Sequence, residues 1–401
     1  MKKILFTLLM TCGLFAADAT IEIVKHIKNL PSISIKSGAN KTMFQRKFEK
    51  VLVGDIKVSS NFDLKEGEFA KSDYVLSYTL NDLNSLIVTV RLMGKDGVEY
   101  FNKKYRLKNQ EKYPFLSHKI VMDINDLLKL PSIDWMDNLV IFSKYTGRKQ
   151  AEIVIADYTL TYKKTIIRNG LNLFPKWADK FHKSFYYTSY SDFMPTLYKY
   201  DIFTGRKEKI ITSPGMLVCG DVSKDGRKLL LTMTTNDQPD IYIYDTITKR
   251  KQRVTKLKGI EVNGNFVDND SRVVFVSDIL GYPNIFSIGL RGQNFQQMVF
   301  HGKNNNTCST HQNYIVYSSR ETNSEFGGNI FNLYLMSTQT NYVRKLTMNG
   351  RNLYPRFSDD GDTVMFIKKY ENQSALGIIR LSHNKSYLFP LKLGKIQSID
   401  W

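Results

Sequence analysis

Short runs of alternating apolar and polar residues, separated by turn-forming residues, fill most of the chain after residue 135. Such alternation is typical of β-strands with one buried face. Polar turns such as Ser223-Lys-Asp-Gly226 separate the runs, and Asp and Gly supply the caps and positive φ angles of tight hairpins. The pattern predicts short antiparallel strands, among them 185–189, 229–233, 273–277, 314–318 and 363–367.

The strands recur with a period of 43 to 48 residues, and a glycine marks each copy. Seven residues after each glycine lies a position, termed the slot, that is usually large and apolar. The glycines are Gly170, Gly215, Gly259, Gly302, Gly350 and Gly394, and the slots are Trp177, Val222, Phe266, Ser309, Phe357 and Trp401. Four short strands in each period are typical of a β-propeller blade, and we expect the aromatic slots to pack between blades.

Trp135 stands 42 residues before Trp177 and resembles a further slot, so the interval to Trp401 holds six repeats. The sequences Ser132-Ile-Asp-Trp135 and Ser398-Ile-Asp-Trp401 are identical. This identity predicts that the last residues form a strand completing the blade that begins at the other end of the domain. Such closure removes exposed sheet edges. The sequence therefore predicts an all-β six-bladed propeller over residues 131–401.

Residues 20–130 have a different pattern. Phe44, Phe48, Val51 and Leu52 fall on one face of a helix, with charged residues opposite. The turn at 94–97 predicts a hairpin. Further strands are expected at 20–24, 32–35, 74–80, 86–93 and 98–107, and a second helix at 115–128. This segment is predicted to be a small N-terminal α/β domain.

The first 19 residues have the build of a secretory signal peptide. Lys2 and Lys3 precede an apolar run, and small residues occupy 16–19 with an Asp among them, so cleavage after Ala16, Ala17 or Ala19 fits. Cys12 leaves open a lipoprotein signal, although Thr is a poor residue before a modified Cys. We expect the mature chain to be exported and soluble, because no later stretch has the ~20 apolar residues of a membrane-spanning helix.

The formal net charge is +19, and it is +17 once Lys2 and Lys3 are removed. Either the lysines simply solvate the surface, or they steer the protein toward acidic partners or an anionic envelope surface. Nucleic-acid binding is disfavoured, because the basic residues are scattered and the chain is exported. Cys219 and Cys308 fall in different repeats, so free buried thiols are expected rather than a disulfide.

Catalytic motifs are missing from the sequence: it has no Gly-x-Ser-x-Gly, His-Glu-x-x-His, Cys-x-x-Cys or phosphate-binding glycine loop. His118, at a helix start, is expected to be a hydrogen-bonded structural residue. The Asp residues of the turns are interpreted as turn caps rather than calcium ligands. We therefore expect no enzyme, cofactor or metal. The alternative is an exported propeller hydrolase or lectin with a site in the channel.

Partner-binding residues are expected just before each slot, because inner strands of a propeller begin at the channel mouth. Asn172 and Asn352 occupy one repeat position and could instead bond the backbone between blades. Glu261 and Asn263 depart from the repeat, which favours a functional role. The full set of candidates is Asn172, Phe174, Asp221, Glu261, Asn263, Thr307, Asn352 and Tyr354.

Four short sequences, together with the signal and the two domains, resemble the TolB family of the Tol-Pal envelope system. They are Phe275-Val-Ser-Asp278 with Gly281-Tyr-Pro-Asn-Ile-Phe286, Arg344-Lys-Leu-Thr347, Ser117-His118 and the C-terminal Ile399-Asp-Trp401. The resemblance covers essentially the whole mature chain.

The resemblance implies a monomeric periplasmic scaffold that reaches membranes only through its partners. It would bind a Pal-like lipoprotein at the mouth of the propeller channel. Its mature N-terminus would be a mobile segment that docks on a TolA-like inner-membrane protein, formed by Ala19, Thr20, Ile21, Glu22, Ile23 and Val24. The assembly would support outer-membrane integrity and envelope constriction at cell division.

Overall fold

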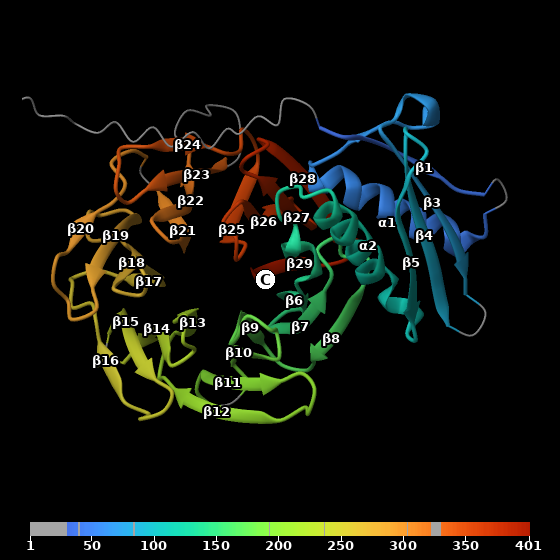
Figure 1. Cartoon of the computed structure of the whole chain (residues 1–401). Helices are drawn as coiled ribbons and strands as arrows, with labels where there is room; N and C mark the ends of the chain where they lie inside the picture. Colours follow the sequence, from blue (N-terminus) through green and yellow to red (C-terminus); the bar gives the residue numbers. More distant parts are fainter. Residues whose placement is uncertain are drawn as a thin grey trace, which may run out of the picture.

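The computed structural model describes residues 30–38, 41–82, 85–191, 193–235, 237–302, 304–321 and 330–401. A five-stranded sheet with two helices forms one part, and a ring of mainly four-stranded sheets forms the larger part (Figure 1). In the described part of the chain no helix is long and apolar enough to cross a membrane.

The N-terminal part has the sheet order β2-β1-β3-β4-β5, in which β1 is parallel to both neighbours and the other pairs are antiparallel. Its elements are β1 Ser32–Lys36, α1 Met43–Ser59, β2 Asp63–Leu64, β3 Tyr74–Asn81, β4 Leu86–Gly94, β5 Glu99–Leu107 and α2 Tyr113–Leu127, with short 3-10 helices at Phe69–Lys71, Gln110–Lys112 and Asp134–Asp137. The predicted strand at 32–35, the later strands and both helices are confirmed within a few residues. The predicted strand at 20–24 lies outside the described residues.

Local sequence explains where α1 begins and which face of the sheet it covers. The Thr42 hydroxyl accepts the amide of Gln45 at 3.2 Å, and the Gln45 side chain accepts the amide of Thr42 at 2.9 Å, which forms a capping box. Alternate residues of β4, from Leu86 to Leu92, are fully buried. Both helices lie between the sheet and the ring of sheets, so they cover the face that these residues present (Figure 1).

The larger part is built from antiparallel four-stranded units arranged around a common axis (Figure 1). Four sheets are separate: β9–β12, β13–β16, β17–β20, and β29 with β6–β8. The units β21–β24 and β25–β28 join into one eight-stranded sheet through a single parallel pairing of Phe331 with Arg351.

The strands of this part have the following bounds: β6 Val140–Gly147, β7 Gln150–Ala156, β8 Lys163–Ile167, β9 Asn172–Trp177, β10 Ser184–Ser189, β11 Thr196–Asp201, β12 Lys207–Thr212, β13 Leu217–Val222, β14 Lys228–Thr234, β15 Pro239–Asp245, β16 Lys251–Arg253, β17 Glu261–Val267, β18 Arg272–Ser277, β19 Asn284–Gly289, β20 Gln296–Gln297, β21 Asn305–His311, β22 Tyr314–Arg320, β23 Phe331–Ser337, β24 Val343–Lys345, β25 Arg351–Phe357, β26 Thr363–Lys369, β27 Ser374–Arg380, β28 Lys385–Pro390 and β29 Lys395–Asp400.

The C-terminal strand joins the two ends of the ring. β29 pairs antiparallel with β6, with Ile399 opposite Phe142, which confirms the pairing predicted from the repeated Ser-Ile-Asp-Trp sequence. The two copies nevertheless fold differently. Trp135 lies in a 3-10 helix rather than in a strand, and its ring packs 5.7 Å from that of Trp401. The interpretation of Trp135 as a further slot is therefore wrong, because β29 already supplies the strand that leads to that position.

The two parts meet at a fully buried polar cluster. His118 of α2 contacts Asp55 of α1 at 2.9 Å and Asp157, after β7, at 3.5 Å. The hydroxyls of Ser117 and Tyr158 both donate to Asp55. Burial alone would lower the pKa of His118, but the two carboxylates outweigh it and raise the pKa to about 9. His118 is thus a charged structural residue that ties the helices to the ring.

The remaining predictions about the core concern the slots and the thiols. Trp177 and Phe266 are each 5% exposed and pack in clusters that span neighbouring sheets. Cys219 and Cys308 are buried and free, as predicted. Burial raises the pKa of both thiols above its usual value, so neither is a ready nucleophile.

Candidate functional site at the ring axis and rim

Each inner strand contains a β-bulge near the axis of the ring. The pairing shifts by a residue between β9 and β10, and the other inner strands shift in the same way. At four bulges a non-glycine residue has positive φ: Phe174 (54°), Asn263 (56°), Thr307 (41°) and Tyr354 (54°). Bulges re-aim side chains, and such backbone conformations persist only where their surroundings hold them. Four predicted site residues therefore share one structural role.

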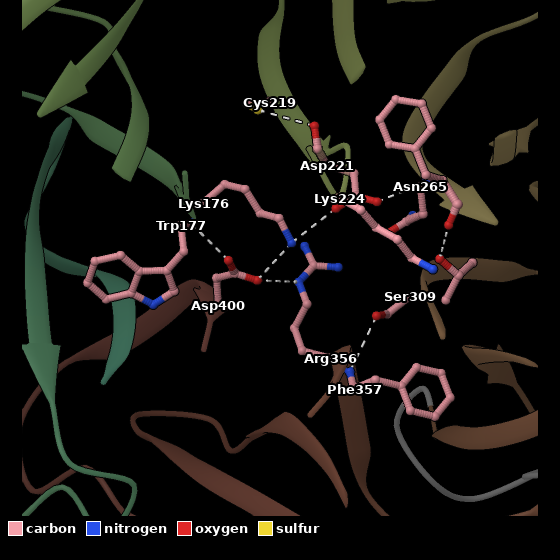
Figure 2. Close-up of polar contacts among 12 residues, drawn as sticks. Lys176, Trp177, Cys219, Asp221, Lys224, Asn265, Ser309, Arg356, Phe357 and Asp400 are labelled. Carbon is pink, nitrogen blue, oxygen red and sulfur yellow. Dashed lines mark hydrogen bonds and ion pairs between the residues drawn. The ribbon is translucent and has the colours of Figure 1, made fainter. Parts of the chain in front are cut away.

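A network of four charges crosses the axis. The Lys176 ammonium lies 3.1 Å from the Asp400 carboxylate and 3.3 Å from that of Asp221. The Arg356 guanidinium lies 3.6 Å from Asp400 and also donates to the Cys308 carbonyl at 3.3 Å. Figure 2 shows Lys176 and Arg356 converging on Asp400. Burial alone would lower the pKa of Lys176, but Asp400 and Asp221 raise it, so the lysine is charged.

The same carboxylates link adjacent sheets through the backbone. Asp400 accepts the amide of Trp177 at 2.9 Å, and Asp221 accepts the amide of Phe266 at 2.9 Å. In both pairs the carboxylate stands one residue before its own slot and binds the slot amide of the next unit. The network therefore links the inner strands of neighbouring units and also places charged groups at the axis of the ring.

Three of the predicted partner-binding residues are buried beneath the surface. Asn172 and Asn352 donate to the Ala151 and Phe331 carbonyls of the preceding unit, at 3.2 and 2.9 Å. Glu261 occupies the equivalent place and is fully buried. These side chains support the sheets from within and do not present polar groups to a partner in this structure.

The other five candidates lie partly exposed around the axis. Asp221 belongs to the charge network, and the Asn263 amide donates to the Cys308 carbonyl at 2.9 Å. The Tyr354 amide donates to the Thr307 hydroxyl at 3.3 Å. Phe174 is half-buried at its bulge. These contacts connect inner strands of different units around the axis.

Exposed apolar side chains lie at the end of the ring where the inner strands begin. Five lie in the segments that lead into inner strands: Met216, Ile260, Phe300, Met348 and Leu393. Turns between second and third strands add Phe193, Ile279, Leu280 and Tyr370. The amide of Thr234 bonds the Met216 carbonyl at 2.9 Å and that of Ile260 bonds Asp278 at 2.7 Å, so the two kinds of segment lie side by side. We term these nine residues the rim.

The rim is far more apolar than a solvated turn requires. Phe300 is 83% exposed, Leu393 82% and Met348 78%. Large exposed apolar patches mark interaction surfaces, whereas single scattered apolar residues do not. Sequence reasoning missed the rim, although every member lies within a few residues of a marker glycine or a second-strand end.

Comparison with known proteins assigns the chain to a family. Residues 138–401, more than half of the chain, match the family model of the TolB beta propeller domain. The chain belongs to the TolB family. Curated relatives named "Tol-Pal system protein TolB" are 46% identical in Wolinella succinogenes and 47% in Campylobacter jejuni, over all of both chains in each comparison. A Helicobacter pylori relative of the same name is 40% identical over the same full coverage.

Solved TolB structures show the same fold. The crystal structure of TolB from Acinetobacter baumannii matches with a TM-score of 0.75 at 20% identity, covering 92% of this chain and 96% of that one. A TolB structure from Agrobacterium tumefaciens matches with a TM-score of 0.51 over 63% of this chain and 95% of that one, at 14% identity. The mainly β-stranded propeller is therefore shared across distant TolB sequences.

Two further predictions for this TolB chain concern metal ions and the N-terminal segment. No group of three or more His, Cys, Asp or Glu residues able to hold a metal occurs in the described ranges. The predicted N-terminal partner segment, Ala19, Thr20, Ile21, Glu22, Ile23 and Val24, lies outside the described residues.

Proposed function

We propose that this chain is a non-catalytic, periplasmic protein-binding scaffold of a Tol-Pal system. Its rim binds a Pal-like lipoprotein, and its mature N-terminus, residues 20–24 of the predicted segment 19–24, binds a TolA-like inner-membrane protein. Through these contacts it supports outer-membrane integrity and envelope constriction at division. Full-length identity of 40 to 47% to proteins named for the Tol-Pal system supports the general role.

The proposal includes an architecture. The units around the axis are interpreted as six blades, with β29 completing the unit of β6–β8, and residues 131–401 are interpreted as one domain. Residues 20–130 form the second domain, and residues 1–19 are a signal peptide removed on export.

The rim is the observation that carries the proposal. An exposed ring of Phe, Ile, Leu and Met side chains offers apolar area to a folded partner, while the charge network beneath holds the inner strands in place. Of the eight residues predicted from the sequence, the partly exposed Phe174, Asn263, Thr307 and Tyr354 remain candidates for contact at the centre of the rim, and Asp221 remains a candidate within the charge network.

The test is calorimetric titration of the mature chain with the Pal-like lipoprotein, its lipid removed. Met348→Ser and Leu393→Ser should each weaken binding at least fivefold without lowering the melting temperature, since both side chains are largely exposed. Phe203→Ser is the matched control, because Phe203 is 76% exposed but lies in a turn between third and fourth strands, at the other end of the blades. Equal weakening by all three variants, or by none, contradicts the proposal.

A second experiment tests the division of labour between the two segments. Removal of residues 20–24 should abolish binding of the TolA-like protein and leave binding of the Pal-like lipoprotein. Loss of both activities contradicts the assignment of separate sites.

A further inference from the structure

One buried carboxyl group in the described part of the ring has an oxygen without a hydrogen-bond partner. Glu261, the first residue of β17, is fully buried. Its Oε1 accepts the Ser277 hydroxyl at 3.2 Å, but its Oε2 has no hydrogen-bond donor among the described residues. A buried carboxylate oxygen without a donor is costly, so this atom requires an explanation.

A second buried carboxyl faces Glu261 from the neighbouring sheet. Asp240, in β15, is 3% exposed, and its carboxyl lies close enough to Glu261 to raise the pKa of that group. Asp240 Oδ1 also accepts the Arg253 guanidinium at 2.8 Å and the Thr255 hydroxyl at 3.5 Å. Two carboxylates offer only acceptors, so a bond between them needs a proton on one.

The charged groups around the pair favour Glu261 as the protonated partner. Arg253 lies 2.8 Å from Asp240 and forms an ion pair with it, whereas Glu261 has no cation partner among the described residues. The Asp278 carboxylate, on the turn after β18, accepts the Ile260 amide and adds negative charge beside Glu261. Lys256 and Lys258, in the segment before β17, are exposed.

The repeat shows what this position does elsewhere in the ring. Glu261 pairs with Ser277 across the strands, as Asn305 pairs with Ser319 in a later unit. The Asn305 side-chain amide donates to the Asn284 side-chain oxygen at 3.0 Å, and Asn284 begins β19 much as Asp240 begins β15. An amide pair at one junction is thus replaced by a carboxyl pair at another. Only a proton lets the carboxyl pair form the same bond.

We propose that Glu261 and Asp240 form a proton-binding site, in which the Glu261 carboxylic acid donates its Oε2 hydrogen to the Asp240 carboxylate. When the Glu261 acid loses its proton to water, two buried carboxylates remain next to a single guanidinium, that of Arg253. The junction between the two sheets is then weakened by their repulsion. The inference goes beyond the proposed function, since it concerns protonation of the fold itself.

The surroundings set the pH range of this site. Burial, and after it Asp240, raise the pKa of Glu261 to about 7. In the folded state this pKa stands above the ordinary value of 4.5, so the stabilisation is complete below pH 4.5 and is lost as pH rises through 7. The adjacent Ile260 belongs to the rim. That part of the rim should therefore become less ordered as pH rises through 7.

Infrared spectroscopy of the full mature chain tests the proton directly. At pH 6 the spectrum should contain the carbonyl band of a protonated carboxylic acid, and the band should fade as pH rises through 7. Glu261→Gln should lack the band and keep the fold, because its amide supplies the donor to Asp240. The exposed Glu371→Gln, a matched loss of one carboxyl, should retain the band. Persistence of the band in Glu261→Gln, or its absence from the unmodified chain at pH 6, overturns the proposal.

Thermal unfolding supplies a second measurement that does not depend on the band. Across pH 7 the melting temperature of the unmodified chain should fall more than that of Glu261→Gln, and Glu371→Gln should behave as the unmodified chain does. Parallel pH profiles of the unmodified chain and Glu261→Gln refute the site. A calcium-dependent rise in melting temperature that is lost in Glu261→Gln also refutes it, because a cation would then occupy the place of the proton.

Discussion

Asp400 is the residue whose removal most directly tests how the ring is held together. Its side chain is 4% exposed and receives the Trp177 amide at 2.9 Å and the Lys176 ammonium at 3.1 Å, with Arg356 at 3.6 Å. In Asp400→Ala, Lys176 keeps only Asp221, and Arg356 keeps its carbonyl partners. Loss of one partner of a buried ion pair costs about 3–5 kcal/mol. Because both cations retain other partners, we expect about 3 kcal/mol.

Asp400→Asn separates the charge from the hydrogen bond. The amide oxygen can still accept the Trp177 amide, so only the charged interactions with Lys176 and Arg356 are lost. We expect a cost of about 2 kcal/mol, within the range for hydrogen bonds to charged groups. The difference between the two variants measures the backbone bond between neighbouring units.

Urea unfolding at neutral pH, followed by tryptophan fluorescence, measures these costs, since Trp177 and Trp401 both adjoin the site. Asp359→Ala is the control: it removes an exposed carboxylate and should change the unfolding free energy by less than about 0.5 kcal/mol. A cost below about 1 kcal/mol for Asp400→Ala, or one equal to that of the control, would show that the charge network does not hold the ring.

Three further predictions concern closure and the junction of the two parts. Deletion of 395–401 removes three buried apolar side chains and the pairing with β6, so the unfolding free energy should fall by more than about 5 kcal/mol, and an unchanged melting temperature would contradict closure. Burial lowers the pKa of His118, but Asp55 and Asp157 raise it from 6.5 to about 9, so its stabilisation is complete below pH 6.5 and lost as pH rises through 9. The stability advantage of the unmodified chain over His118→Gln should therefore shrink by about 3 kcal/mol across that range in urea titrations, and a constant difference would refute a charged histidine. Tyr387→Phe removes hydroxyl hydrogen bonds of 3.0 Å to Ser60 and 2.7 Å to the Lys57 carbonyl. The variant should lower the free energy of unfolding by about 1 kcal/mol in the same assay, and an unchanged value would mean that this contact does not stabilise the fold.

The period of the marker glycines and the alternation within each copy were sufficient to predict the strands of the ring, because strand and turn formation depend on neighbours in the chain. The same reasoning placed α1, α2 and the hairpin of β4 and β5. It failed for Trp135, whose sequence is identical to that around Trp401. Two identical tetrapeptides cannot both occupy one strand position, and pairing with β6 settled which of them did.

For the candidate site, too, local sequence predicted some features and packing between units decided others. Sequence reasoning placed Asn172 and Asn352 at one repeat position, with a backbone bond between blades as an alternative that the structure shows. Glu261 was selected because it departs from the repeat. The burial of all three depends on packing between adjacent units. The bulges were likewise invisible, since an extra residue in a strand is defined only by its partner.

The sequence determined the repeat, the order of elements and the family, since each depends on spacing and residue type along the chain. Tertiary structure alone decided which charges meet at the axis. Lys176 and Asp400 are 224 residues apart, and they touch because β29 returns to β6. It also decided that Glu261, a residue expected to face a partner, is fully buried. Such long-range contacts follow from closure of the ring: the repeated Ser-Ile-Asp-Trp sequence predicted the closing strand, but not which side chains it would bring together.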